Sequence, residues 1–426
     1  MTIIIINYRF FISGGPERYL FNVIDLLQKN GHTVIPFSVK HNKNNPTPYE
    51  NYFLDAIGDG DEVYANEYNK TNFDTIKKSL GRMLYSKEAK RKLKVLIRDV
   101  KPDLIYVLYY QNKISASIFE AADESNIPVV IRISDFGQIC ANSLLYRSQQ
   151  NTICEKCVNG SKWNAVKYKC VQNSYVYSAI KAASLTIAES VVKIRPKINA
   201  YVVPSTFTMQ KLSEYGIDNK KLNHIPTFFN HEIIANTSSV SYQPFALYVG
   251  RIVQEKGLLT MIKAFANTNL NLKIIGFSDN MYQLELEKYL EDKPHNIEFL
   301  GRKSFHEIVP FLQKCAFTIV PSEVYDNFPN SVLESYAFKK AVIATDLGSL
   351  KEMIIDRKTG VLFKIHDQTD LREKVIELLN NPDLCEQYGI NGFKKLEDEF
   401  GAEMHYEKLM NVFSGVLKKD MQVVMS

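Results

Sequence analysis

The sequence predicts an α/β protein made of two doubly wound domains that face one another across a cleft. Three observations predict this class. At 426 residues, the chain is longer than one hydrophobic core usually serves. Short β-branched runs alternate with helical patterns through both halves, which is typical of parallel strands covered by helices on both faces. A polar, poorly periodic stretch, NHEIIANTSSVSYQ, separates the two halves.

The composition is that of a folded globular protein. The chain is 45% apolar, 23% charged and 12% aromatic, unlike a disordered chain. No apolar run approaches the roughly 20 residues that span a bilayer. The apolar start, MTIIIINYRFF, lacks a basic beginning and a small-residue cleavage site. We therefore interpret it as a buried first strand rather than a signal peptide, and we expect the protein to be cytoplasmic.

The first half alternates strand and helix patterns. Its expected helices are ERYLFNVIDLLQKNG, a basic helix and SASIFEAADESN, followed by two shorter helices that flank SLTIAES. Its expected strands are TIIIINY, HTVIPFSV, DLIYVLYY, IPVVIRIS, SLTIAES and AYVVPS.

The second half repeats this design. Its expected strands are FALYVGR, NLKIIGF, IEFLG, FTIVPS and AVIATD, and its expected helices are GLLTMIKAFANT, MYQLELEKYLED, FHEIVPFLQKC and SVLESYAFKK. We therefore predict an N-terminal domain over 1–229, a linker over 230–242 and a C-terminal domain over 243–403. A terminal helix over 404–426 is expected to cross back to the first domain.

The basic helix of the first half runs from Lys77 to Lys101 and carries ten Lys or Arg against two acids. Leu93, Leu96 and Val100 recur at helical spacing, which indicates an amphipathic helix. Its basic face is either a solvated surface or a surface for anionic lipid headgroups. Nucleic acid is disfavoured as a partner, because no base-reading motif accompanies the charge.

Four of the six cysteines lie in a polar insertion over about 138–172. A C-x2-C pair with two outlying thiols favours a structural Zn²⁺ held by four thiolates. A redox pair is less favoured, since it needs a strand-to-helix setting, and free thiols are the remaining alternative. The predicted ligands are Cys140, Cys154, Cys157 and Cys170. The DGD motif at 59–61 is expected to be a loop rather than a metal site.

The loop after the first strand, FFISGGPERY, carries Gly14 and Gly15. Glycines at a strand-to-helix junction let backbone N–H groups approach an anion, and the helix N-terminus adds a favourable partial charge. Taken alone, such a pair is more often just a tight turn. Because the pattern is neither GxGxxG nor a Walker loop, the usual dinucleotide and ATP fingerprints are absent.

The second half opens with a strand that ends in YVGRIVQEKGLLTMI. Arg251 and Lys256 flank the end of this strand and the start of the next helix. Two cations in this setting suit a diphosphate, and ordinary surface charge is the alternative interpretation.

Two carboxylates, Asp326 and Glu334, are separated by seven residues in YDNFPNSVLES. A helix is expected to begin near Asn330 or Ser331, where free backbone amides can bind oxygen groups. Asp326 then lies in the loop and Glu334 lies one turn into the helix. The two acids do not share a helical face, but they can reach different parts of one extended ligand.

Taken in order, SGGPERY, GRIVQEKG and the D-x7-E spacing resemble retaining glycosyltransferases of the GT-B fold, specifically glycosyltransferase family 4 (group 1). The resemblance covers nearly the whole chain, and the Cys-bearing insertion resembles one seen in a subset of the family. Further matches are GHTV, KPDLIYV, VVPS, IEFLG and PSEVYDNFPNSVLESYAFKKAVIATDLGSLKEMI.

The resemblance implies that a sugar is transferred from a nucleotide diphosphate sugar with retained anomeric configuration and no obligatory divalent metal. It implies that Arg251 and Lys256 hold the diphosphate, that Asp326 contacts the donor sugar and that Glu334 accepts hydrogen bonds from ribose. Asp135 is the remaining residue with an implied catalytic role. The other implied donor-binding residues are Gly14, Gly15, Gly250, Phe299, Leu300, Phe328, Pro329, Asn330 and Ser331.

The sequence departs from the family pattern at two places. Asp326 stands where the family usually has Glu, and Ser134 with Asp135 stands where many members carry His. Two functions are therefore weighed. The first is an active glycosyltransferase at the inner membrane face, acting on a lipid-linked or polysaccharide acceptor of surface glycan synthesis. The second is a non-catalytic nucleotide-sugar-binding or scaffold protein.

Overall fold

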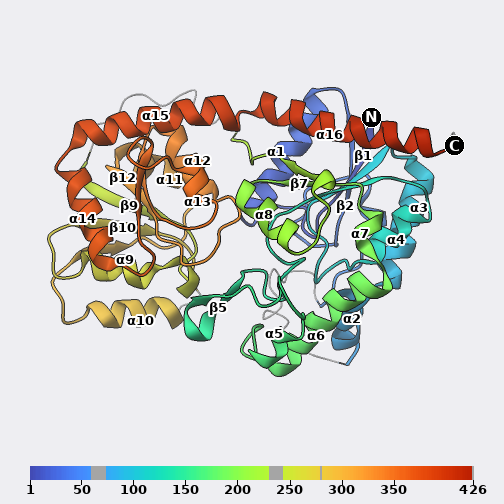
Figure 1. The fold of residues 1–426 in the computed structure, drawn as a ribbon, viewed down its shortest axis with the longest axis horizontal. Coiled ribbons are helices and arrows are strands. Elements are labelled where there is room, and N and C mark those ends of the chain that lie inside the picture. Colours follow the sequence, from blue (N-terminus) through green and yellow to red (C-terminus); the bar gives the residue numbers. More distant parts are fainter. Residues whose placement is uncertain (59–72, 230–242, 279–280, 425–426) are drawn as a thin grey trace.

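The computed structural model describes residues 1–58, 73–229, 243–278 and 281–424. Two α/β domains lie side by side, each built on a six-stranded parallel sheet (Figure 1). The predicted fold class is thereby confirmed. The predicted linker, 230–242, and the DGD motif at 59–61 lie outside the described residues.

The sheet of the N-terminal domain has the order β2-β1-β3-β4-β7-β8. Its central strands are buried on both faces, as expected for a sheet covered by helices on both sides. The strands are β1 (Thr2–Ile6), β2 (Thr33–Phe37), β3 (Leu104–Val107), β4 (Val129–Arg132), β7 (Ala200–Val203) and β8 (Leu222–His224). The helices are α1 (Gly15–Lys29), α2 (Phe73–Leu84), α3 (Lys87–Val100), α4 (Ser117–Asp123), α6 (Tyr175–Thr186), α7 (Ile194–Lys197) and α8 (Thr206–Glu214).

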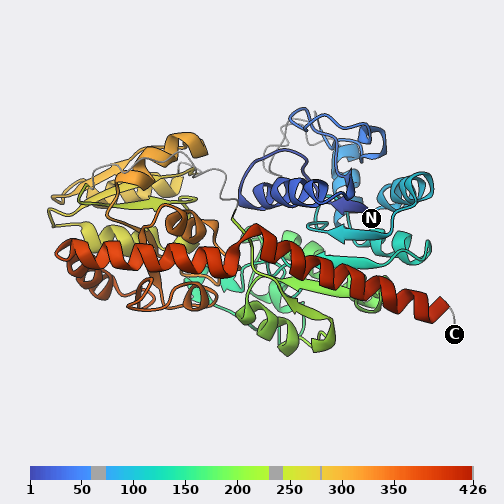
Figure 2. The same cartoon turned by 90° about the horizontal axis from the view of Figure 1, so that it is seen from above.

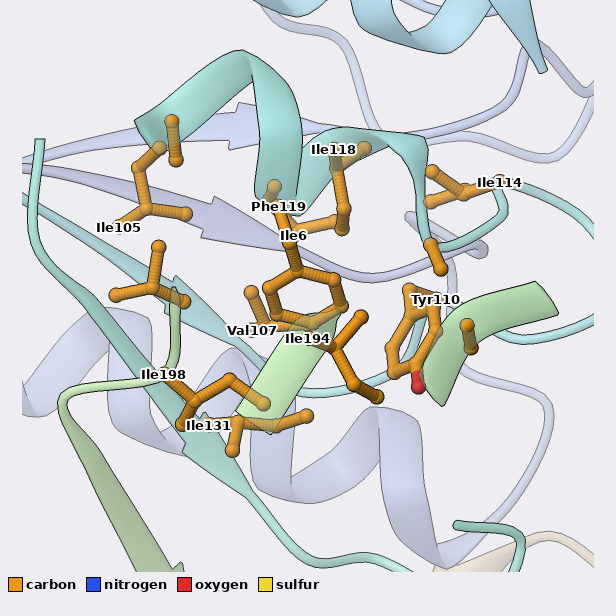
Figure 3. Close-up of a cluster of buried hydrophobic side chains, with 14 of the residues drawn as sticks. Ile6, Ile105, Val107, Tyr110, Ile114, Ile118, Phe119, Ile131, Ile194 and Ile198 are labelled. Carbon is orange, nitrogen blue, oxygen red and sulfur yellow. The ribbon is translucent and has the colours of Figure 1, made fainter. Parts of the chain in front are cut away.

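One face of this sheet is the apolar cluster drawn in Figure 3. Ile6, Val107 and Ile131 project from three neighbouring strands. They pack against Phe119 of α4 and Ile194 of α7. β-branched side chains suit a pleated, buried surface, so these strands form where the sequence predicts them.

The sheet of the C-terminal domain has the order β11-β10-β9-β12-β13-β14. Its strands are β9 (Phe245–Val249), β10 (Asn271–Ile275), β11 (Asn296–Phe299), β12 (Phe317–Val320), β13 (Ala341–Thr345) and β14 (Gly360–Phe363). The helices are α9 (Leu258–Phe265), α10 (Met281–Leu290), α11 (Phe305–Lys314), α12 (Asn330–Ala337), α13 (Leu350–Met353) and α14 (Gln368–Leu379).

Two elements differ from the sequence-based expectation. The basic segment forms two helices, because Ser86 caps α3 by accepting a hydrogen bond from the Ala89 N–H at 3.1 Å. The stretch SLTIAES, expected as a strand, belongs to the end of α6 and to a following π-helical turn over Ile187–Val191. Its apolar run is short, and short apolar runs fit a buried helix as well as a strand.

The insertion over 138–172 forms a small β-hairpin and a short helix. The hairpin strands are β5 (Tyr146–Arg147) and β6 (Thr152–Ile153), and the helix is α5 (Asn164–Lys167). In Figure 1 the hairpin lies below the gap between the two sheets, and α5 lies under the N-terminal domain beside α6.

Two long helices close the chain, α15 (Pro382–Phe400) and α16 (Ala402–Val424). Figure 2 shows that together they run across both domains. Leu409, Phe413 and Val416 of α16 are buried in the N-terminal domain, in one cluster with Leu20 of α1 and Ile3 of β1. Among the described residues, no helix is long and apolar enough to cross a membrane.

Candidate active site

Topology places one ligand crevice in each domain. In an open α/β sheet, ligands bind at the carboxyl ends of the strands where the strand order reverses. That point lies between β9 and β12 in the C-terminal domain and between β1 and β3 in the N-terminal domain. The loops that carry the predicted site residues follow β1, β9 and β12, so they meet at these edges.

The glycine loop of the N-terminal domain touches the start of α12 in the C-terminal domain. Gly14 precedes α1 in extended conformation, and Gly15 is the first residue of that helix. A Cβ atom on Gly15 would lie 2.7 Å from Nδ2 of Asn330, which begins α12. A side chain at Gly15 would displace the Asn330 amide, so the two predicted donor-binding segments meet at this point.

Lys256 and Asp326 form an ion pair within the C-terminal domain. Asp326 Oδ2 is buried and has no hydrogen-bond partner among the described residues. Its main-chain carbonyl accepts a hydrogen bond from the Ser349 hydroxyl at 2.5 Å, which fixes the loop. One carboxylate oxygen is thus free to accept a hydroxyl donor.

Glu334, on α12, forms an ion pair with Arg18 of α1 across the two domains. Burial raises the pKa of the Glu334 carboxyl, and the Arg18 guanidinium opposes this shift. The Glu334 side chain is 6% exposed, whereas that of Arg18 is 39% exposed. A buried carboxylate with an exposed partner can exchange that partner for a ligand without leaving its place in the helix.

Arg251 lies apart from Lys256. Its side chain is 57% exposed and its Nη2 lies 3.6 Å from Glu255 Oε1. Its carbonyl accepts a hydrogen bond from the Tyr248 hydroxyl at 2.7 Å, and a Cβ on Gly250 would lie 2.7 Å from that hydroxyl. The predicted pair of cations therefore shares one loop, but only Lys256 points to the carboxylate of Asp326.

The predicted base- and sugar-lining residues divide between two faces of the sheet. Leu300 and Phe328 pack against the same buried cluster, and Phe328 also contacts Phe400 with ring centroids 5.4 Å apart. Phe299, the last residue of β11, packs against the opposite cluster. Pro329 caps α12.

Ser331 belongs to the first turn of α12, where its carbonyl accepts a hydrogen bond from the Ser335 hydroxyl at 2.6 Å. With Asn330 it forms the start of the helix, as the sequence predicts.

Asp135 follows β4 in the N-terminal domain. It accepts a hydrogen bond from the Gly137 N–H at 2.7 Å. Burial raises the pKa of Asp135, while the Gly137 N–H, the Lys181 ammonium and the Tyr109 hydroxyl oppose the shift. Ser134 donates to the Leu108 carbonyl at 3.1 Å, so its hydroxyl is engaged in holding β3 to β4.

Asn327 joins the Asp326 loop to the N-terminal domain, and sequence reasoning did not single it out. Its Nδ2 donates to the Ile133 carbonyl at 2.8 Å, and its Oδ1 accepts from the Thr208 hydroxyl at 2.8 Å. Ile133 is two residues before Asp135. The amide of Asn327 therefore places the two loops that carry Asp326 and Asp135 next to each other.

Arg18 and Glu323 were also missed. Arg18 lies one turn after the glycine pair. A cation beside a loop that is predicted to bind an anion could have indicated this residue. Glu323 is buried and contacts three residues from distant parts of the chain, which no local pattern reveals. Its partners are Thr260 Oγ1 at 2.6 Å, Asn151 Nδ2 at 3.0 Å and His366 Nδ1 at 3.1 Å.

All six cysteines are free. Burial raises the pKa of the Cys157 thiol to about 11 and that of Cys170 to about 12, and the neighbouring thiols add to both shifts. The Cys140 thiol donates to Asn142 Oδ1 at 2.9 Å. Within the described part of the chain, no group of three or more His, Cys, Asp or Glu is placed to hold a metal ion. The four predicted ligands nevertheless lie near one another, since Cys140, Cys154 and Cys157 all raise the pKa of Cys170, and the zinc site stays a prediction.

Comparison with known proteins identifies the class. Residues 230–395 match the family described as glycosyl transferases group 1. The predicted resemblance to group 1 glycosyltransferases is thus confirmed.

Two relatives extend the comparison. An uncharacterized glycosyltransferase of Methanocaldococcus jannaschii is 37% identical over 180 residues, which is 42% of this chain and 48% of that protein. The capsular polysaccharide biosynthesis glycosyltransferase CapM of Staphylococcus aureus is 24% identical over 214 residues, 49% of this chain and 53% of that protein. The matches span about half the length of these curated relatives.

Solved structures share the fold over nearly the whole chain. Sucrose-phosphate synthase from Thermosynechococcus elongatus has a TM-score of 0.69 at 17% identity, covering 98% of this chain and 99% of that one. Anabaena HepE in complex with UDP and glucose has a TM-score of 0.62 at 14% identity, covering 97% and 99%. At such identities these likenesses establish the fold alone.

Proposed function

We propose that the protein is a retaining glycosyltransferase that moves a sugar from a nucleotide diphosphate sugar to a lipid-linked or polysaccharide acceptor in surface glycan synthesis. One observation carries the proposal. The loop after β1 meets the start of α12 where Gly15 touches Asn330, and the ion pairs of Lys256 and Glu334 flank this contact. A helix N-terminus, a lysine and two carboxylates then converge on one extended ligand.

The proposed roles follow from charge and burial. Lys256 and Arg251 bind the diphosphate, and Lys256 stabilises the charge that develops on the leaving group, a role that elsewhere a metal ion fills. Asp326 exchanges Lys256 for hydroxyls of the transferred sugar, since its Oδ2 has no partner among the described residues. Glu334 exchanges Arg18 for the ribose hydroxyls.

The remaining roles concern the walls of the site. Gly14 and Gly15 bring backbone N–H groups to the phosphates, and Gly250 leaves room beside them. Asp135 supplies a polar group from the acceptor side. Leu300 and Phe328 supply apolar contacts for the base and the sugar. The first amides of α12, with that of Phe328 before Pro329, line the sugar.

The surface-glycan part of the proposal is supported by the relatives. CapM is named for capsular polysaccharide biosynthesis. Another relative, 23% identical over 278 residues, is a poly(ribitol-phosphate) α-N-acetylglucosaminyltransferase of Staphylococcus aureus. We accordingly place the enzyme at the inner face of the membrane, where lipid-linked acceptors are made.

The rival function is nucleotide-sugar binding without transfer, which Ser134 and Asp326 favour as departures from the family pattern. Thermal unfolding with a panel of nucleotide sugars identifies the donor. A donor at 100 times its dissociation constant stabilises the fold by roughly 2.7 kcal/mol. Turnover with that donor supports the enzyme, stabilisation without turnover supports the rival, and no stabilisation by any nucleotide sugar refutes both.

Lys256→Ala tests the diphosphate role. We expect kcat/KM to fall by about 100-fold or more, because one preorganised charge at the leaving group is lost. Lys351→Ala is the matched control, since it removes a lysine from an exposed ion pair with Asp346 in the same domain. Equal rates for the two variants would contradict the role of Lys256.

A structural zinc ion on Cys140, Cys154, Cys157 and Cys170 stays a prediction, and metal analysis of the purified protein tests it. About one Zn²⁺ per chain would support it, with the thiols rearranged into a tetrahedral set. A metal-free, folded protein would reject it.

A further inference from the structure

An apolar and basic face on the N-terminal domain takes no part in the active site. We call it the α6 face and define it by five exposed side chains: Ile76, Trp163, Tyr175, Val176 and Tyr177. Their exposed fractions are 46%, 51%, 57%, 66% and 49%.

The concentration of these side chains is unusual for this domain. Among the large hydrophobic side chains exposed in the described part of the N-terminal domain, only Ile12 and Val191 lie elsewhere. Single exposed apolar residues are ordinary, whereas several on neighbouring elements are typical of an interaction surface.

Three neighbouring elements form this face. α6 packs against both α5 and α2, and the Ser184 hydroxyl of α6 donates to the Met83 carbonyl of α2 at 2.5 Å. Figure 1 shows the three helices together at the edge of the domain that lies opposite α16. Trp163 immediately precedes α5, and Ile76 lies in α2.

The side chains of the first turn of α6 cannot all face the interior of the domain. Tyr175, Val176 and Tyr177 are consecutive, so they cover more than half of the helix circumference at about 100° per residue. The inward side of α6 is already formed by Ser178, Ala182 and Leu185.

The charge of this region has a single sign. Residues 156–188 contain five lysines and no Asp or Glu, and three of these lysines, Lys156, Lys167 and Lys169, are not buried. Among the described residues, no carboxylate lies within 4.0 Å of the ammonium of Lys156, Lys167 or Lys169. Lys169 Nζ instead lies 4.5 Å from the centre of the Tyr175 ring.

The basic face of α3, the sequence-based candidate for lipid contact, is different. Lys90 pairs with Glu120 at 3.0 Å and with Glu124 at 2.5 Å, and Lys94 pairs with Glu124 at 3.1 Å. No large hydrophobic side chain of α3 is exposed. A surface that is neutralised by its own acids attracts anionic headgroups less than the α6 face does.

We propose that the α6 face binds an anionic lipid bilayer. Tyr and Trp rings suit the boundary between headgroups and acyl chains, and lysine stems lie along that boundary with their ammonium groups at the phosphates. Apolar insertion and electrostatic attraction then act together, as they do for interfacial helices.

The insertion connects the α6 face with the C-terminal domain. The same segment that carries Trp163 carries Asn151, whose Nδ2 donates to Glu323 of the C-terminal domain at 3.0 Å. Docking would therefore hold the cleft beside the bilayer, where a lipid-linked acceptor resides. Only this last step rests on the proposed function.

Trp163 is the only tryptophan in the chain, so its fluorescence tests the proposal directly. The full chain is mixed with vesicles of equimolar phosphatidylcholine and phosphatidylglycerol, and separately with phosphatidylcholine alone. We expect the emission to shift to shorter wavelength and the protein to co-sediment with the anionic vesicles. No shift and no co-sedimentation, or equal binding to both vesicles, would overturn the proposal.

Two variants test whether the α6 face, rather than α3, binds the bilayer. Lys167→Gln with Lys169→Gln should lower the partition coefficient about 25-fold, since each lysine near an anionic surface contributes about fivefold. The triple variant Tyr175→Ser, Val176→Ser and Tyr177→Ser should abolish the emission shift of Trp163. All substituted side chains are at least partly exposed, and unchanged thermal unfolding confirms that the variants fold.

Two control variants remove similar groups elsewhere. Met281→Ser with Leu284→Ser removes exposed apolar side chains of α10, and Lys87→Gln with Arg91→Gln removes two cations of α3. Both should bind as the native chain does. A larger loss from the α3 variant than from the α6 variants would overturn the proposal, as would an emission shift caused by a soluble glycan or protein but not by vesicles. Vesicle binding by a chain that binds no nucleotide sugar would refute the proposed function alone.

Discussion

At the scale of single residues, the cations of the candidate site pair with its carboxylates. Lys256 pairs with Asp326 and Arg18 pairs with Glu334, so each carboxylate that we propose to bind the donor already has a cation. A donor that brings phosphates and hydroxyls would replace both partners at once. The diphosphate offers the cations a new anion, and the sugar and ribose hydroxyls offer the carboxylates new donors.

Asp326→Glu is the substitution that addresses the departure from the family pattern. The longer side chain of Glu moves the carboxylate by one methylene toward the sugar while keeping its charge beside Lys256. We expect the ratio of kcat/KM values for two donor sugars to change by about tenfold or more, the discrimination that one methylene commonly supplies.

Asp346→Glu serves as the control for this change, because Asp346 pairs with Lys351 on the exposed surface of the same domain. It should leave the ratio unaltered. An identical ratio for the Asp326 variant and the native chain would count against the contact between Asp326 and the sugar.

The spacing of residues revealed part of this site. Asp326 in a loop and Glu334 in a helix follow from turn and capping signals that lie within eleven residues of sequence, YDNFPNSVLES. Arg18, Asn327 and Glu323 were missed because their partners lie in other elements or in the other domain. A pairing of this kind depends on the tertiary arrangement, which a single sequence does not encode locally.

At the scale of elements, the strands were predictable because each is a short, continuous β-branched run. The division of the basic segment into α2 and α3 was not. Ser86 caps α3, and its own N–H and carbonyl are held by the hydroxyls of Ser115 at 2.9 Å and Ser117 at 2.7 Å. The break is thus fixed by Ser115, before α4, and by Ser117, the first residue of α4, about 30 residues further along the chain.

The docking of α16 depends on a buried histidine. His405 Nδ1 donates to the Pro226 carbonyl at 2.8 Å, and the Tyr19 hydroxyl donates to Nε2 at 3.0 Å. The Tyr106 hydroxyl lies 2.9 Å from that of Tyr19, and the guanidinium carbon of Arg132 lies 3.8 Å from the centre of the Tyr19 ring. Phe228 covers the imidazole. This network ties α16 to α1 and to the end of the N-terminal domain.

We expect the network to make stability depend on pH. Burial lowers the pKa of His405 to about 3, and the Pro226 carbonyl opposes this shift, while Arg132 and Lys408 add to it. Because the unfolded chain takes up the proton near pH 6.5 and the folded chain does not, the stabilisation is complete above pH 6.5 and is lost as the pH falls toward 3. At pH 5 the loss is roughly 2 kcal/mol.

Denaturant unfolding at pH 7 and pH 5 measures this contribution. His405→Phe should lower the free energy of unfolding at pH 7, since Tyr19 and Pro226 lose their partner. Between pH 7 and pH 5, however, the free energy of unfolding of this variant should fall by about 2 kcal/mol less than that of the native chain. His306→Gln, an exposed histidine of α11, should leave the native pH dependence intact. A His405 variant with the native pH dependence would contradict this account.

At the scale of the whole molecule, polar contacts between described residues hold the domains together at the cleft, and we consider four of them. Arg18 reaches Glu334, Asn327 reaches Ile133 and Thr208, and Asn151 reaches Glu323. In the fourth, Glu352 of α13 accepts hydrogen bonds from the first N–H groups of α8, with Thr206 N at 2.8 Å. The paired domains could be predicted from the sequence, whereas these contacts could not, since each joins two polar residues far apart in the chain.

Tyr325 adds aromatic contacts with Phe136 and Phe207 of the N-terminal domain. Interfaces between domains of one chain usually permit relative motion, and the proposed donor site lies between the two domains. Glu352 stabilises the α8 N-terminus, where a carboxylate contributes about 1 kcal/mol. We expect the double variant Glu352→Gln with Asn327→Ala to favour an open arrangement. Its radius of gyration in solution scattering should exceed that of the native chain, and a saturating nucleotide sugar should return it toward the native value, because the donor contacts both domains.

Glu377→Gln is the matched control for this measurement. It breaks an ion pair with Arg357 at 2.7 Å that lies within the C-terminal domain and bridges no gap between domains, so the radius should stay native. A double variant as compact as this control would show that the polar contacts at the cleft do not set the domain arrangement. A double variant that stays expanded with the donor bound, and still turns over normally, would separate closure from catalysis and contradict the role that we assign to the cleft contacts.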